Sequence, residues 1–159
     1  LFTFQLKDAF SANETGYYLL FGAACGMISL YFTRMMFFFE GAIQRLKNDF
    51  GRAAIGGISL AVIILTFPPI YGEGYATIKS LLTGNSNDIF HHSFYYWLAD
   101  NQISLIIFLF LIILVKPIAT ALTIGAGGSG GIFAPSLFMG GLSGYLFSST
   151  SNSISPLRK

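Results

Sequence analysis

The chain contains 159 residues, of which 53% are apolar, 16% are aromatic and 10% are charged, and its net charge is +2. Soluble domains carry about 25% charged residues, so this composition argues against an ordinary soluble fold and indicates a membrane protein. The small net charge argues against nucleic acid as a partner, and the single cysteine, Cys25, excludes an internal disulfide and a cysteine-rich metal cluster.

Two apolar stretches in the first half predict membrane-spanning helices. Residues 14–39 contain a single cation, Arg34, and about 20 helical residues suffice to cross the hydrocarbon core. Residues 53–68 predict a shorter span that ends at two consecutive prolines. Small residues recur in it at four-residue spacing and predict the face that packs against another helix, namely Ala53, Gly57 and Ala61. No charged segment with a cleavage site precedes these spans, so we expect no signal peptide.

The connections between the spans predict their orientation. Residues 40–52 contain three cations, whereas residues 71–101 contain Lys79 as their single lysine or arginine. By the positive-inside rule, we expect residues 40–52 on the cytoplasmic side and residues 71–101 on the external side. The apolar stretch 76–82 is too short to cross, which predicts a re-entrant or interfacial helix.

Two adjacent histidines, His91 and His92, lie in the external connection among aromatic residues. Neighbouring side chains on a helix diverge, and no third ligand lies nearby in the sequence, so we expect no metal site. Aromatic residues at this position are typical of the belt at a membrane boundary.

A third span is predicted for residues 102–124, with Lys116 and Pro117 interrupting it about 20 Å along the helix at 1.5 Å per residue. A lysine at that depth is expected to face protein or water rather than lipid. Lys116 either adds positive potential to a vestibule for anions or extends its amine to the inner membrane boundary. The sequence leaves both interpretations open.

A glycine loop then opens into a last short helix, residues 132–147, and no charged residue lies between Lys116 and Arg158. The first four amides of a helix have no internal acceptor, and the helix dipole places about half a positive charge there. Pro135 suits a first helical turn. These properties predict an anion site on bare backbone amides, as in the broken helices of secondary transporters. The loop and helix start that shape this site are Gly128, Ser129, Gly130, Gly131, Ala134 and Pro135.

Three other interpretations of the glycine loop explain the sequence less well. A flexible linker does not account for a loop between two apolar runs that ends in a proline. A phosphate loop of the Walker type needs Gly-Lys followed by Ser or Thr, and a dinucleotide fingerprint needs a preceding strand and a later acidic residue. The sequence has none of these features, and we predict no catalytic residues and no enzyme activity.

Two motifs resemble the CLC family of chloride channels and proton-coupled chloride transporters. Residues 128–135 are similar to the family's GxFxP signature, and residues 69–75 are similar to its proline followed by a Gly-x-Gly-aromatic turn. The resemblance covers most of residues 16–147 and implies an all-α fold of polytopic membrane helices, some short, broken or re-entrant. It also implies that the backbone amides of Ile132 and Phe133 help to coordinate chloride, which is the substrate rather than a cofactor.

The resemblance implies further properties of the complete protein. It predicts chloride transport, by a channel or a proton-coupled antiporter, in a homodimer within the lipid bilayer of the plasma (inner) membrane. The family's other chloride ligands and its gating glutamate belong to motifs that we do not find here, so this chain is expected to form one wall of the ion site and to need the rest of the subunit. Residues 148–159 do not resemble the family's continuation and are expected to form a tail. Two alternatives stay open, namely another anion transporter with a broken helix and a structural membrane subunit.

Overall fold

The computed structural model describes residues 15–82 and 102–154, and all regular structure in these two ranges is helical. The elements are α1 (Thr15–Gln44), α2 (Asp49–Thr66), the short 3-10 helix η2 (Pro68–Ile70), α3 (Tyr75–Leu82), α5 (Gln102–Gly125) and α6 (Phe133–Ile154). Among the described residues, α1, α2 and residues 103–125 are long and apolar enough to cross a membrane. The predicted all-α class with membrane-spanning helices is confirmed.

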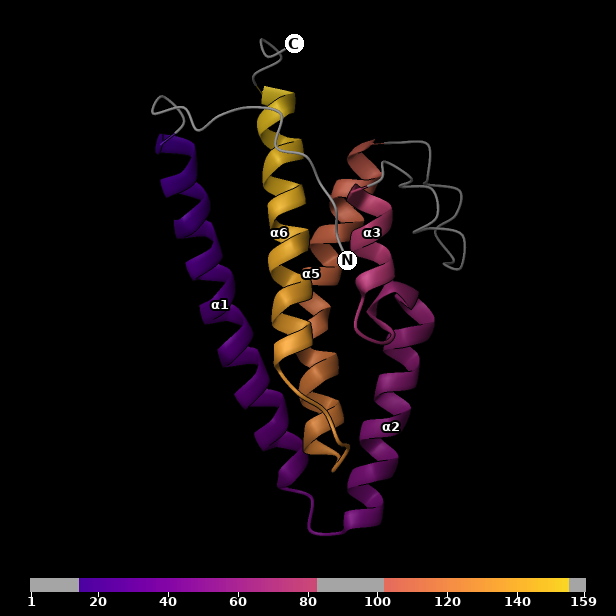
Figure 1. Ribbon diagram of the computed structural model, residues 1–159. Coiled ribbons are helices and arrows are strands. Elements are labelled where there is room, and N and C mark those ends of the chain that lie inside the picture. The colour runs from indigo at the N-terminus through magenta and orange to yellow at the C-terminus, as the bar shows by residue number, and fades with distance from the viewer. Residues whose placement is uncertain (1–14, 83–101, 155–159) are drawn as a thin grey trace.

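Helix α5 lies at the centre and packs against α1, α2 and α6. Figure 1 shows α1 on one side of it, and α2 followed by α3 on the other. The core side chains come mainly from α5 and α6, and Leu109, Ile112, Phe138 and Leu142 are fully buried. The most apolar helix is therefore the one surrounded by the others.

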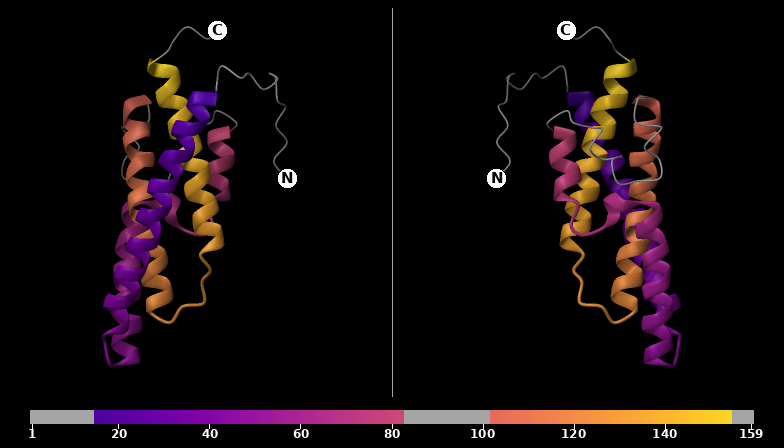
Figure 2. Two further views of the ribbon diagram at one scale, coloured as in Figure 1. Left: turned by 90° about the vertical axis from the view of Figure 1, so that its left-hand side faces the viewer. Right: turned by 90° about the vertical axis from the view of Figure 1, so that its right-hand side faces the viewer.

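The connection between α5 and α6 lies at the same end of the molecule as the turn between α1 and α2. The side views in Figure 2 show that the chain turns back after α5 and that α6 begins part way along it. The start of α6 is therefore inside the bundle's length rather than at its end. The half-helices of secondary transporters also begin within the length of the helical bundle.

The turn between α1 and α2 is shorter than the predicted connection 40–52. Helix α1 continues to Gln44, and α2 begins at Asp49 because the side chain of Asn48 caps it by accepting from the Phe50 amide at 3.1 Å. Such a cap satisfies one of the amides that a helix start leaves free. The apolar pattern predicts only the apolar part of each helix, so it did not predict the polar turns at the end of α1 and the start of α2.

Helix α6 also differs from the prediction, because it continues to Ile154 and does not end at Phe147. The polar residues after Phe147 include no glycine or proline before Pro156, and serine and threonine weaken a helix without ending it. The Thr150 hydroxyl donates back to the Leu146 carbonyl within the helix. The first part of the predicted tail is therefore helical, and residues 155–159 lie outside the described ranges.

Helix α5 is not interrupted at Lys116 and Pro117, contrary to the sequence interpretation, and runs through both residues. Of the small residues in α2, it is Gly56 that packs against α5, whereas Ala53, Gly57 and Ala61 are exposed in the described chain, so the stripe that they form does not pack against α5. Because small residues recur at several spacings in α2, the sequence does not distinguish the face that meets α5.

Candidate anion site at the start of α6

The first glycines of the loop terminate α5. Gly127 has φ +92°, its amide donates to the Ile124 carbonyl at 3.0 Å, and the Gly128 amide donates to the Thr123 carbonyl at 2.9 Å. These two bonds form a Schellman motif, which satisfies carbonyls at a helix end and favours glycine in the left-handed position. A Cβ atom at Gly128 would lie 2.8 Å from the Thr123 oxygen. Gly128 therefore closes the end of α5, a role that the sequence interpretation did not distinguish from shaping the anion site.

The remaining loop leads to the start of α6 and leaves its amides free. Phe133 is the first helical residue, and the Ile132 carbonyl accepts from the Ser136 amide at 3.0 Å. Within the described ranges, the N–H groups of residues 129–134 donate to no acceptor. Ile132 and Phe133 are 51% and 75% exposed. The two predicted chloride donors thus lie at a helix start with free amides, and both residues are exposed in the described chain.

A cavity of about 420 Å³ lies behind this start and joins it to α5 and to the turn after α2. Ile132 and Phe133 do not line it, but Lys116, Thr120 and Thr123 of α5 do. The predicted site-shaping residues that line it are Ser129, Gly130, Gly131, Ala134 and Pro135. The structure therefore brings these five residues together with Lys116 around the cavity, and Ile132 and Phe133 are not among the residues that line it.

Lys116 is 4% exposed and lies inside the bundle. Its Nζ donates to the carbonyl oxygens of Ile70 at 2.6 Å and Gly72 at 2.9 Å. The interpretation in which this amine extends to the membrane boundary is wrong, because both acceptors lie between α2 and α3, one at the end of η2 and the other in the turn that follows it. Glu73 lines the same cavity but forms no salt bridge with Lys116. The positive charge next to the cavity is therefore not paired with a carboxylate of the described chain.

The sequence contained one signal for the partners of Lys116. Two prolines and a Gly-x-Gly turn break the chain after α2, and such a break leaves carbonyls without helical donors. A lysine within an apolar span needs polar partners. The two requirements are complementary, but the sequence alone does not show that the two segments meet.

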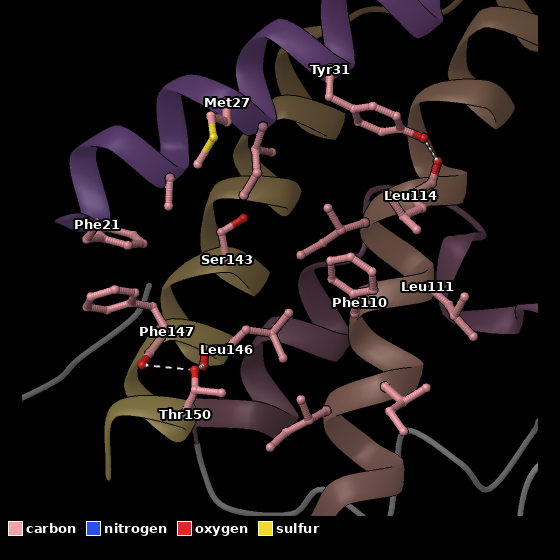
Figure 3. Close-up of a pocket in the computed structure, with 15 residues that line it drawn as sticks. Phe21, Met27, Tyr31, Phe110, Leu111, Leu114, Ser143, Leu146, Phe147 and Thr150 are labelled. Carbon is pink, nitrogen blue, oxygen red and sulfur yellow. Dashed lines mark hydrogen bonds between the residues drawn. The ribbon is translucent and has the colours of Figure 1, made fainter. Parts of the chain in front are cut away.

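A second, larger cavity of about 540 Å³ lies between α1, α5 and α6 and has an almost wholly apolar lining. Figure 3 shows Tyr31 at its edge donating to the Leu114 carbonyl, at 2.7 Å. The Ser143 hydroxyl is also occupied, since it donates to the Met139 carbonyl at 2.6 Å. This cavity thus offers an anion no charge and no free hydroxyl donor, which distinguishes it from the cavity at Lys116.

The described residues contain no group of three His, Cys, Asp or Glu side chains that could hold a metal ion. His91 and His92 lie outside the described ranges, as do residues 83–101 as a whole.

The comparisons with known proteins extend over nearly the whole chain. A family model described as "Voltage gated chloride channel" matches residues 1–158. The expectation that the likeness ends at Phe147 is therefore wrong, since the match includes almost all of the predicted tail. No solved structure matches the chain.

Two relatives illustrate the similarity. "Chloride channel protein CLC-f" of Arabidopsis thaliana is 32% identical over 152 residues, which cover 92% of this chain and 18% of that protein. "H(+)/Cl(-) exchange transporter ClcA" of Vibrio parahaemolyticus is 30% identical over 144 residues, which cover 87% of this chain and 27% of that protein. The chain therefore spans about a fifth to a quarter of the length of these relatives.

Proposed function

This chain belongs to the family of voltage gated chloride channels, and on that premise we propose that the complete protein moves chloride across a membrane. The observation that carries the proposal is the start of α6, where the amides of Ile132 and Phe133 have no acceptor among the described residues. Chloride is the substrate in this proposal, and no cofactor takes part. The protein transports an ion and does not catalyse a chemical reaction.

The physical basis is the replacement of the ion's water shell by backbone donors. An anion that enters a membrane protein loses hydration, and free amides at a helix start can take the place of the lost water molecules. The half charge of the helix dipole contributes roughly 2 kcal/mol at about 4 Å and an effective dielectric near 20. An interaction of this size binds chloride and still allows its release.

We propose separate roles for the residues around the site. Ile132 and Phe133 donate their amides to chloride, and the opposite wall comes from other parts of the complete subunit. Ser129, Gly130, Gly131, Ala134 and Pro135 shape the loop and helix start, and Lys116 adds positive potential to the adjoining cavity. The last role is supported by the absence of a salt bridge to Lys116 within the described chain.

The mode and setting of transport are also proposals. The names of the relatives include a channel and a proton/chloride exchanger, so both modes are candidates, with protons as the second substrate in an exchanger. We propose a homodimer in the plasma (inner) membrane, with residues 40–52 on the cytoplasmic side and residues 71–101 on the external side. Three cations in the first connection and one in the second support this orientation.

Chloride efflux from liposomes tests the proposed function. We expect vesicles that contain the complete protein to release chloride, and an exchanger to move protons in the opposite direction at the same time. Vesicles without protein are the control, and organic carboxylates are the competing substrates. Efflux equal to that of empty vesicles would contradict the proposal. Preferential transport of a carboxylate would instead favour a different anion transporter.

A further inference from the structure

Phe138 contacts the break in helical structure between α2 and α3, at Ile70–Gly74, and so connects this break with the start of α6. Its side chain is fully buried, one helical turn and a half after Phe133. A Cβ atom at Gly74 would lie 2.3 Å from the Phe138 ring, so the ring packs directly on the Gly74 backbone. Gly74 has φ +78°, a conformation in which glycine is favoured. The turn can therefore approach the ring closely only because residue 74 has no side chain.

Lys116 joins the same break to α5. The prolines of η2 cannot donate hydrogen bonds, and the carbonyls of Ile70 and Gly72 accept from no backbone amide in the described ranges. The Lys116 amine donates to both of them, at 2.6 Å and 2.9 Å. The same Nζ lies 5.1 Å from the centroid of the Phe138 ring, which is within the range of a cation–π interaction.

These contacts connect three elements through two side chains. We propose that Lys116 and Phe138 form a clamp that positions the start of α6 against α5 and the break at Ile70–Gly74. Phe138 follows Phe133 by five residues, or about 7.5 Å along a helix, and a helix transmits such a displacement nearly rigidly. The clamp therefore determines the position of the free amides of α6. Its effect on chloride affinity rests on the proposed function. Lys116 and Phe138 are positioning residues here, since neither needs to touch the ion.

The choice of lysine supports this role over ordinary packing. Burying an ammonium group is unfavourable unless hydrogen bonds satisfy it, so an apolar side chain would fill the same space with less cost. Lysine offers what an apolar residue lacks, namely donors for the two carbonyls and a charge for the ring. Arginine keeps the charge and several donors but has a larger, planar head group.

The test is hydrogen exchange of the complete protein in lipid nanodiscs, with chloride affinity measured on the same samples. In Lys116→Met and in Phe138→Leu, we expect amide exchange of residues 136–140 to become about tenfold faster and chloride affinity to fall about tenfold. Lys116→Met loses the hydrogen bonds from a charged group, and Phe138→Leu loses the ring that packs on Gly74 and lies next to the amine. Lys116→Arg keeps the charge and the donors but places a larger planar group at the two carbonyls and the ring, so we expect its exchange rate and its chloride affinity to lie between those of the wild type and of Lys116→Met. Lys47→Met removes an exposed lysine in the turn between α1 and α2 and is the matched control, with no change expected.

Each outcome decides the proposal. Unchanged exchange in both Lys116→Met and Phe138→Leu would overturn the clamp, and so would lower chloride affinity in Lys116→Met without faster exchange, because charge alone would then explain the effect. If Lys116→Met does not fold, Phe138→Leu and Lys116→Arg carry the test. If the wild type binds no chloride, the proposed function fails, while the exchange rates still show whether the clamp exists.

Discussion

Replacing Phe133 by proline in the complete protein is expected to weaken chloride binding about 10- to 100-fold. The substitution removes the backbone N–H that we assign to the ion, and a hydrogen bond to a charged group contributes about 1.5–3 kcal/mol. Phe133 is the first residue of α6, where proline fits the helix geometry. The change therefore removes a donor and leaves the helix start in place. Isothermal titration calorimetry with chloride measures the affinity.

Phe133→Ala is the matched control for this experiment. It keeps the N–H group and removes a ring that is 75% exposed in the described chain. We expect its chloride affinity to stay close to that of the wild type. Equal losses in Phe133→Ala and Phe133→Pro would assign the effect to the ring, and an unchanged affinity in Phe133→Pro would remove Phe133 from the site.

The second large effect is expected for Gly56→Val, at the contact between α2 and α5. A Cβ atom at Gly56 would lie 2.5 Å from the Cβ of Ala126 and 3.3 Å from the Leu122 carbonyl oxygen. Overpacking of this kind costs about 1–3 kcal/mol, because backbone must shift to relieve it. Ala126 directly follows α5 and precedes the glycine loop, so the shift is expected to lower chloride affinity as well. Thermal unfolding of the detergent-solubilised complete protein measures the loss of stability.

Gly57→Val provides the comparison one residue further along α2. A Cβ atom at Gly57 would meet no other atom within 4 Å in the described chain, and the two substitutions change helix propensity equally. We expect its unfolding temperature to be near that of the wild type. If Gly57→Val destabilises the protein as much as Gly56→Val, then the packing face of α2 is not the one described.

Much of this architecture follows from local sequence signals. Long apolar runs predicted the spans, because lipid admits only helices whose backbone groups are satisfied internally. Glycines followed by Pro135 predicted a helix start at Ile132, within one residue of the start at Phe133. In both cases the deciding interactions lie within a few residues of one another.

The remaining features depend on contacts between distant segments. Lys116 bonds carbonyls 46 and 44 residues away, and no local pattern identifies such partners. Gly56 rather than Gly57 meets α5 because of how α2 is rotated about its axis, which packing decides. The glycine loop combined two functions in one stretch, since Gly127 and Gly128 end α5 before the free amides begin. The sequence pattern did not separate them.

The most direct measurement of the central claim is the location of a heavy halide in crystals of the complete protein grown with bromide. The account predicts an anomalous bromide peak within hydrogen-bonding distance of the backbone nitrogens of Ile132 and Phe133. Ordered bromide elsewhere in the membrane domain, with none at the start of α6, would contradict it.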